Sequence, residues 1–303
     1  MIIGTIIIIT MILLSIFALI PIEKDYDDNG KNWMSMVSDD TNICDMSIPG
    51  THDSGAFHSL FDVAGKCQDL SISKQLEIGV RFLDLRLQMV NNEFNIVHSF
   101  VDQNLKFKSV LDDLDNFIND NNKEFIIISI KEDADKVSSN RDFEELLLEY
   151  LNEYSNICYD KSLPKTLGEA RGKIHILSRY ELSFGIPAYK GWKDDDSFKL
   201  DNMYIQDNYC IDNTIDKKND IKETMNYAKE SSNELVLNFT SCYLDNSFPP
   251  SYAGTSALDI NPWLLEVFNN NDKLGIVVAD FITVELSALI YERNIRWKDY
   301  LIF

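Results

Sequence analysis

The chain has 303 residues, of which 45% are hydrophobic and 11% aromatic, and its formal net charge is −21. This composition supports a sizeable core and excludes a disordered or fibrous protein. The acidity excludes nucleic acid as a partner, because phosphate backbones are bound by clustered Lys and Arg. It also favours neutral membrane surfaces over anionic ones, which would repel the chain.

The first 22 residues are apolar and carry no charged side chain. A run of this length fits the core of a signal peptide, an N-terminal membrane anchor or a buried helix, and no basic start or clear cleavage site separates the first two. A signal peptide or an anchor predicts a secreted or membrane-anchored protein whose folded domain is exported. Residues 23–40 are polar and contain an Asn-Gly turn pair, which predicts a linker into a single domain over 41–303.

Seven short apolar runs rich in β-branched residues predict strands. They cover 80–87, 94–98, 125–130, 174–178, 203–206, 234–240 and 274–281. Most of them are nearly continuous in their hydrophobicity, which suits parallel strands that are buried on both faces. Apolar residues at helical spacing predict helices over 107–118 and 143–154. Alternating strands and helices, without a glycine-rich nucleotide loop, predict an α/β protein with a (β/α)8 TIM-type barrel rather than a doubly wound sheet.

Functional residues of such barrels lie at the C-terminal ends of the strands. Polar residues lie at or just past the ends of five predicted strands: His98, Lys131, Arg179, Asp207 and Asp280. The sequence therefore predicts a polar site at one end of the barrel.

The chain has four histidines, and two of them are candidates for catalysis. His175 lies inside an apolar strand and is predicted to be a core residue, and His58 has no evident partner. His52, in the stretch SIPGTHDSGAF, and His98 occur in a turn and at a strand end, with acidic residues available to orient them. Histidine suits acid–base chemistry because its pKa lies near neutral pH.

Five cysteines are spaced without any CxxC pair or zinc-finger pattern, so no zinc site is expected. Buried, unreactive thiols are favoured, and a disulfide stays open if the chain is exported.

Eight segments in order resemble the catalytic domain of phosphatidylinositol-specific phospholipases C, in particular the small bacterial type. The segments are SIPGTHDSGAF, GVRFLDLRL, NIVHSF, EFIIISIKED, RGKIHILSRY, YIQDNY, LVLNFTS and VVADFI. The resemblance covers residues from about 40 to about 285. It implies a distorted barrel that cleaves phosphatidylinositol to diacylglycerol and inositol 1,2-cyclic phosphate, without a cofactor or a metal. Release of glycosylphosphatidylinositol-anchored proteins is a possible second activity, and peripheral membrane contact by a monomer is expected.

The resemblance also implies roles for individual residues. His52 matches the general base and His98 the general acid, with Asp280 and Asp53 as their respective carboxylate partners. Asp53 could instead be an ordinary turn or helix-capping residue. Arg86 matches the arginine that stabilises charge on the phosphate, and Asp84 lies two residues before it on the same strand face. The matching positions for the inositol ring are Lys131, Arg179, Asp207 and Tyr209.

Two residues depart from the family pattern, since Ser99 and Leu87 stand where glycine is common, and either side chain could narrow the site. The segment 242–254, together with Phe57, Leu60 and Phe61, could form an apolar rim that touches lipid or could simply pack as loops. Two alternatives remain. A metal-dependent phosphodiesterase barrel would need a cluster of Asp, Glu and His, and a noncatalytic inositol-lipid-binding module would be expected to lack one of the catalytic side chains.

Overall fold

The computed structural model describes residues 28–58, 65–159, 162–244, 252–268 and 272–295. The apolar segment 1–22 lies outside these residues. Within the described ranges, no helix is both long enough and apolar enough to cross a membrane.

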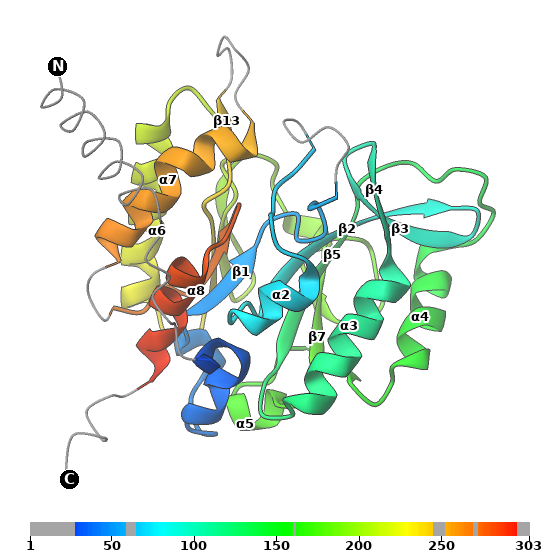
Figure 1. The fold of residues 1–303 in the computed structure, drawn as a ribbon, viewed down its shortest axis with the longest axis horizontal. Helices are drawn as coiled ribbons and strands as arrows, with labels where there is room; N and C mark the ends of the chain where they lie inside the picture. Colours follow the sequence, from blue (N-terminus) through cyan, green and yellow to red (C-terminus); the bar gives the residue numbers. More distant parts are fainter. Residues whose placement is uncertain (1–27, 59–64, 160–161, 245–251, 269–271, 296–303) are drawn as a thin grey trace, which may run out of the picture.

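A strongly curled sheet forms the centre of the molecule (Figure 1). Its parallel strands are β1 (Ile48–Thr51), β2 (Phe82–Val90), β5 (Ile126–Glu132), β6 (Cys158–Tyr159), β7 (Ile174–Ser178), β8 (Ile186–Pro187), β10 (Met203–Gln206), β12 (Leu235–Phe239) and β14 (Ile276–Ala279). The strand order β6-β7-β5-β2-β1-β14-β12-β10-β9 is that of a barrel wall. Within the described chain no pairing joins β8 to β9 (Ser197–Leu200), so the barrel is open there. The predicted α/β barrel fold is confirmed.

Helices cover the outside of this sheet. They are α2 (Ile72–Glu77), α3 (Phe107–Asp120), α4 (Phe143–Glu153), α5 (Leu167–Ala170), α6 (Thr214–Glu230), α7 (Ala253–Val267) and α8 (Val284–Tyr291). Short 3-10 helices are η1 (Asp28–Met36), η2 (Ile43–Asp45), η3 (Tyr189–Gly191) and η4 (Glu292–Asn294). In Figure 1, α6, α7 and α8 cover one flank, and α3 and α4 cover the other. The structure contains both helices predicted from periodicity.

Successive residues of the parallel strands pack alternately into one of two separate apolar cores, which explains why these strands are hydrophobic at almost every position. Along β2, Phe82 faces the inner core, and Leu83 and Leu85 face the outer core beneath the helices. The inner core extends as far as Phe239 at the end of β12, whose ring packs edge-on against His52, and polar side chains lie beyond it.

The predicted linker over 23–40 is wrong for the part that the structure describes. Trp33 and Met34 of η1 are fully buried in the inner core, and Trp33 stacks on Tyr291. The backbone of Gly30 and Lys31 accepts hydrogen bonds from Arg81, which also pairs with Glu124 at 2.8 Å. This segment therefore plugs the barrel end opposite the polar site. Local polarity hid this because the segment buries only a few large side chains.

The predicted strand around 94–98 exists but is not part of the parallel set. β3 (Glu93–His98) pairs antiparallel with the far end of β2 and then with β4 (Val101–Lys106). β2 is long enough to extend past its parallel neighbours, and β3 folds back along this extension. His98, the last residue of β3, consequently lies at the open end of the barrel. A second small sheet, β11 (Cys210–Ile211) with β13 (Tyr243–Leu244), lies at the same end.

Candidate active site

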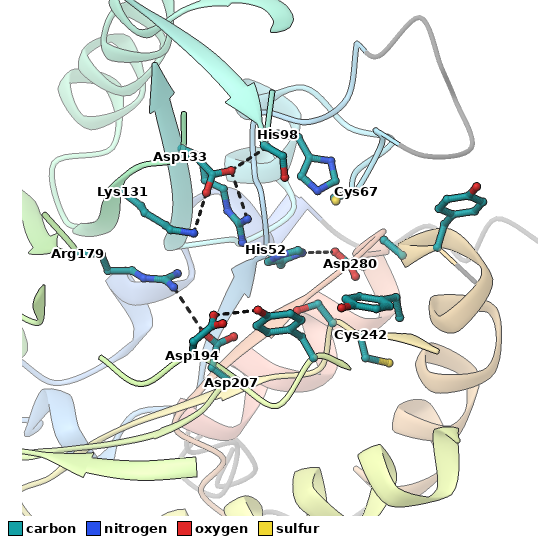
Figure 2. Close-up of a pocket in the computed structure, with 17 residues that line it drawn as sticks. His52, Cys67, His98, Lys131, Asp133, Arg179, Asp194, Asp207, Cys242 and Asp280 are labelled. Carbon is teal, nitrogen blue, oxygen red and sulfur yellow. Dashed lines mark hydrogen bonds and ion pairs between the residues drawn. The ribbon is translucent and has the colours of Figure 1, made fainter. Parts of the chain in front are cut away.

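A cavity of about 440 Å³ opens at the C-terminal ends of the barrel strands (Figure 2). Eight of the ten predicted site residues line it: His52, Arg86, His98, Lys131, Arg179, Asp207, Tyr209 and Asp280. The other two, Asp53 and Asp84, are buried and contact Arg86. The structure thus brings together every residue that the sequence nominated, and the cavity is of a size usual for small-molecule sites.

His52 and Asp280 are neighbours because the strands before them are paired. β1 and β14 run parallel with Thr51 opposite Ala279, so the next residue of each emerges at the same point. His52 Nδ1 lies 2.7 Å from Asp280 Oδ1. The side-chain amide of buried Gln68 donates to the carbonyls of His52 and Ala279, at 2.8 Å each, and fixes the two chain segments together.

The tautomer of His52 follows from its two partners. Arg86 can only donate, and its Nη2 lies 2.8 Å from His52 Nε2. Nε2 therefore accepts, and Nδ1 carries the proton that is donated to Asp280. Burial lowers the pKa of His52, but the charge of Asp280 and its hydrogen bond outweigh burial, and the pKa is raised above its usual value. A neutral imidazole with a free Nε2 lone pair is the form that a general base requires.

Asp53 follows His52 in a tight turn, and its carboxylate reaches Arg86 and His98 rather than Asp280. Its φ of 44° is left-handed, which an Asp tolerates better than most residues. Its Oδ2 lies 3.3 Å from Arg86 Nε and 3.5 Å from His98 Nε2. Both carboxylate oxygens are buried without a hydrogen-bond partner, and burial raises the pKa of Asp53. The turn can approach β3 closely because residue 55 is glycine, where a Cβ would meet Ile96 at 2.4 Å.

Arg86 is held at the centre by carboxylates on three sides. Asp84, two residues earlier on the same strand face, accepts from it at 3.3 Å, and Asp133 lies 3.6 Å from Nη1. Burial alone would raise the pKa of Asp84, but Arg86 and Arg179 hold it well below its usual range. These carboxylates keep the guanidinium at the cavity.

The two departures from the family pattern do not close the cavity. Leu87 is fully buried in the outer core and faces away from the site. Ser99 lines the cavity with a φ of 52°, a conformation that glycine adopts without strain. Its backbone N–H donates to Asp133 Oδ2 at 2.7 Å, which supports the turn after His98.

The residues matched to the inositol ring form the opposite wall of the cavity. Arg179 lies 3.5 Å from both Asp84 Oδ1 and Asp207 Oδ2, and its guanidinium stacks 3.8 Å from the centre of the Trp192 ring. Trp192 also donates to Asp207 at 2.9 Å. Cations and a carboxylate thus alternate along this wall.

Lys131 and Tyr209 complete this wall at its two ends. Lys131 pairs with Asp133 Oδ1 at 2.7 Å, and the Tyr209 hydroxyl donates to Asp194 at 2.8 Å. Burial and the bond to Asp194 raise the pKa of Tyr209, so its hydroxyl stays a donor.

The sequence did not nominate Gln68, Asp133 or Trp192, which contact the candidate site residues. Asp133 could have been predicted, since it lies two residues after Lys131 and side chains at this spacing share one face of a strand. Gln68 and Trp192 lie in loops, and no periodicity marks a loop residue that will contact a site.

Two thiols also line the cavity. Cys67 is fully buried, and burial, with the nearby charges of Asp280 and Asp53, raises the pKa of its thiol well above the usual value. Cys242 lies on the other side, and burial raises the pKa of its thiol to about 11. All five cysteines are free thiols, and no disulfide forms.

The expected apolar rim is only partly within the described chain, because Leu60, Phe61 and 245–251 lie outside it. Phe57 is half-buried and packs against the outer core. At the cavity mouth, the side chain of Phe100, in the β3–β4 turn, is 87% exposed, and Tyr243 of β13 is 40% exposed. β4 and β13 lie at the same upper edge of the molecule in Figure 1.

The model of the family described as phosphatidylinositol-specific phospholipase C, X domain, matches residues 46–180. A protein of Listeria monocytogenes named 1-phosphatidylinositol phosphodiesterase is 30% identical over 277 residues, covering 87% of this chain and 85% of the relative. The chain belongs to the phosphatidylinositol-specific phospholipase C family.

Solved structures of family members have the same fold. A variant of the phosphatidylinositol-specific phospholipase C from Staphylococcus aureus superposes with a TM-score of 0.79 at 27% identity, covering 88% of this chain and 97% of that one. The Listeria monocytogenes enzyme superposes with a TM-score of 0.71 at 26% identity, covering 87% of this chain and 98% of that one.

Proposed function

We propose that the protein is a phosphatidylinositol diacylglycerol-lyase, which cleaves phosphatidylinositol to diacylglycerol and inositol 1,2-cyclic phosphate. The observation that carries this proposal is the pair of histidines that face one cavity, each beside a buried carboxylate, with Arg86 between them. Family membership and the names of the relatives support the substrate class.

The first half of the reaction needs a base and a positive charge. His52 Nε2 takes the proton of the inositol 2-hydroxyl while that oxygen forms a bond to the neighbouring phosphorus. Asp280 stabilises the imidazolium that results, since it lies 2.7 Å from Nδ1. Before this proton transfer, Arg86 leaves Nε2, to which it donates in the resting site, for the phosphate, where it stabilises the charge that develops on a nonbridging oxygen.

The second half needs an acid. The bond between phosphorus and the glycerol oxygen breaks as protonated His98 gives its proton to that oxygen, and diacylglycerol departs. Asp53 supports the protonated form of His98, being 3.5 Å from Nε2. His52 ends protonated and His98 neutral, so exchange with water restores both groups.

The inositol ring is bound by the opposite wall of the cavity. Hydroxyl groups can accept from Lys131 and Arg179 and donate to Asp207, and the ring of Tyr209 offers a flat surface. Because Asp207 would repel an added phosphate, we propose a preference for lipid without ring phosphates.

A metal-dependent phosphodiesterase is the less well supported candidate. Calcium requires six to eight oxygen ligands. The carboxylates nearest the proposed phosphate position, Asp84 and Asp133, are already paired with Arg86, Arg179 and Lys131. Arg86 supplies the positive charge that an ion would otherwise bring, so we propose turnover without a metal.

We also propose peripheral contact with a neutral membrane by an exported domain. The exposed rings of Phe100 and Tyr243 beside the cavity and the net charge of −21 support the contact. The apolar first 22 residues support export.

Two histidine variants test the assignment of base and acid. His52→Ala should lose about 10²- to 10⁴-fold in turnover on every substrate. His98→Ala should lose as much on phosphatidylinositol but little on an inositol phosphodiester with a nitrophenol leaving group, which departs without protonation. His58→Ala, at an exposed position, is the control. Equal losses of His98→Ala on both substrates would contradict the role of His98 as the acid.

A further inference from the structure

A soft-ligand cluster lies within the cavity that the proposed reaction uses. One donor atom each from His52, Asp53 and Cys67 falls within 4.8 Å of the others. Ligand atoms around a tetrahedral zinc ion are separated by about 3.3–3.8 Å, given metal–ligand distances of about 2.0–2.3 Å. Donor atoms at the limit of this range therefore need to approach one another by about 1.0–1.5 Å to hold an ion.

The state of each donor favours this use. His52 is oriented by Asp280 through Nδ1, which leaves Nε2 as the nitrogen for a metal, in the carboxylate–histidine–metal arrangement common in metal sites. Both oxygens of Asp53 are buried and lack a hydrogen-bond partner. Figure 2 shows Cys67 beside His52 and His98, at the same cavity.

We propose that His52, Asp53 and Cys67 form a binding site for a soft or borderline divalent ion such as Cd²⁺ or Zn²⁺, and that occupancy inhibits the enzyme. Binding replaces the proton of the Cys67 thiol, which passes to solvent, and forms metal bonds to sulfur, nitrogen and oxygen. The bound Nε2 can then no longer take a proton from substrate. The binding stands without the proposed function, whereas the inhibition rests on the role of His52 as the base.

Arg86 is the competitor for this ion, since it contacts His52 Nε2 at 2.8 Å and Asp53 at 3.3 Å. Arg86 can release His52 and Asp53 and still keep two carboxylate partners, because Asp84 and Asp133 also contact it. Asp280, nearly buried beside His52, adds a negative charge next to these donors. Hard ions such as Ca²⁺ and Mg²⁺ prefer oxygen and gain little from a thiol.

The test uses Cd²⁺ as the probe on the whole protein, with two readouts. Thiolate-to-metal charge-transfer absorption in the ultraviolet reports binding through sulfur, and turnover of phosphatidylinositol reports inhibition. Wild type should show the absorption with one equivalent of Cd²⁺ and lose activity, with little response to Mg²⁺. Cys67→Ser should weaken both responses by at least roughly tenfold, since even ligand-supporting residues contribute that much. Each variant is compared with its own metal-free activity.

Cys242→Ser is the matched control, because Cys242 lines the same cavity outside the cluster. It should respond to Cd²⁺ as wild type does. Absence of the absorption in wild type, equal sensitivity of Cys67→Ser, or loss of sensitivity in Cys242→Ser would each overturn the site. Binding through Cys67 that leaves turnover unchanged would overturn the inhibition, and the histidine variants would still test the proposed function separately.

Discussion

The exchange Asp280→Asn removes the charge that supports His52 while keeping the size of the side chain. Asp280 is almost completely buried and lies 2.7 Å from His52 Nδ1. An Asn amide can present its NH2 group to Nδ1, which would move the imidazole proton to Nε2 and remove the lone pair that the base needs. It also no longer stabilises the imidazolium formed in the transition state.

We expect turnover of phosphatidylinositol to fall by about 10²- to 10⁴-fold. The lower figure applies if the Asn carbonyl still accepts from Nδ1, and the higher one applies if the tautomer changes. The pH dependence of kcat/KM should shift as well. Burial and Arg86 lower the pKa of His52, and Asp280 raises it above the usual value. Without Asp280 the pKa falls, so the acid limb of the profile moves to lower pH, because the base works in its neutral form.

The assay measures initial rates on phosphatidylinositol in detergent micelles across the range in which histidine titrates. Asp259→Asn is the control, since this exposed carboxylate pairs with Lys218 on the helical flank. An acid limb that stays in place in Asp280→Asn, or a rate within a few-fold of wild type in the folded variant, would refute the assignment of His52 and Asp280 as the base and its partner.

Four further outcomes are expected. Arg86→Ala should lose on the order of 10²- to 10³-fold in turnover, because it removes a donor to the phosphate. A chelator should leave the wild-type rate unchanged. Loss of activity in chelator that added calcium restores would contradict turnover without a metal. Phe100→Ala should bind neutral vesicles that contain phosphatidylinositol roughly tenfold more weakly in a sedimentation assay, since burying a Phe contributes about 1.5–3 kcal/mol. Its hydrolysis of a soluble short-chain lipid should be retained. Glu124→Ala leaves the charge of fully buried Arg81 without its partner and should lower the free energy of unfolding in urea by about 3–5 kcal/mol, with KM unchanged. Glu153→Ala, which removes one partner of an exposed ion pair, is the control, and a smaller loss in Glu124→Ala than in this control would contradict the prediction.

The barrel could be predicted because burial on both faces leaves a pattern in the sequence. Apolar runs such as 125–130 and 174–178 have side chains in two cores at once, and they reappear as β5 and β7. His175 is buried as expected, and burial lowers its pKa to about 4. Periodicity reports burial well, so elements and core residues were within its reach.

Periodicity could not predict the direction in which strands pair or the contacts between distant parts of the chain. An apolar run does not reveal whether it pairs parallel or antiparallel, so the antiparallel pairing of β3 could not be predicted. The segment around Trp33 looked like a linker because its contacts, such as the one with Tyr291, are far away in the chain. The resemblance and the strand ends nominated the candidate site residues, whereas Trp192 contacts them from a loop whose path no local signal reveals.

The identity of the first product tests the central claim most directly. Wild-type protein is incubated with phosphatidylinositol in water enriched in ¹⁸O, and phosphorus NMR follows the products from the earliest times. Attack by the inositol 2-hydroxyl predicts inositol 1,2-cyclic phosphate as the first product, with no ¹⁸O in it. Direct formation of acyclic inositol phosphate that carries ¹⁸O, without a cyclic precursor, would mean that water is the nucleophile and would contradict the account.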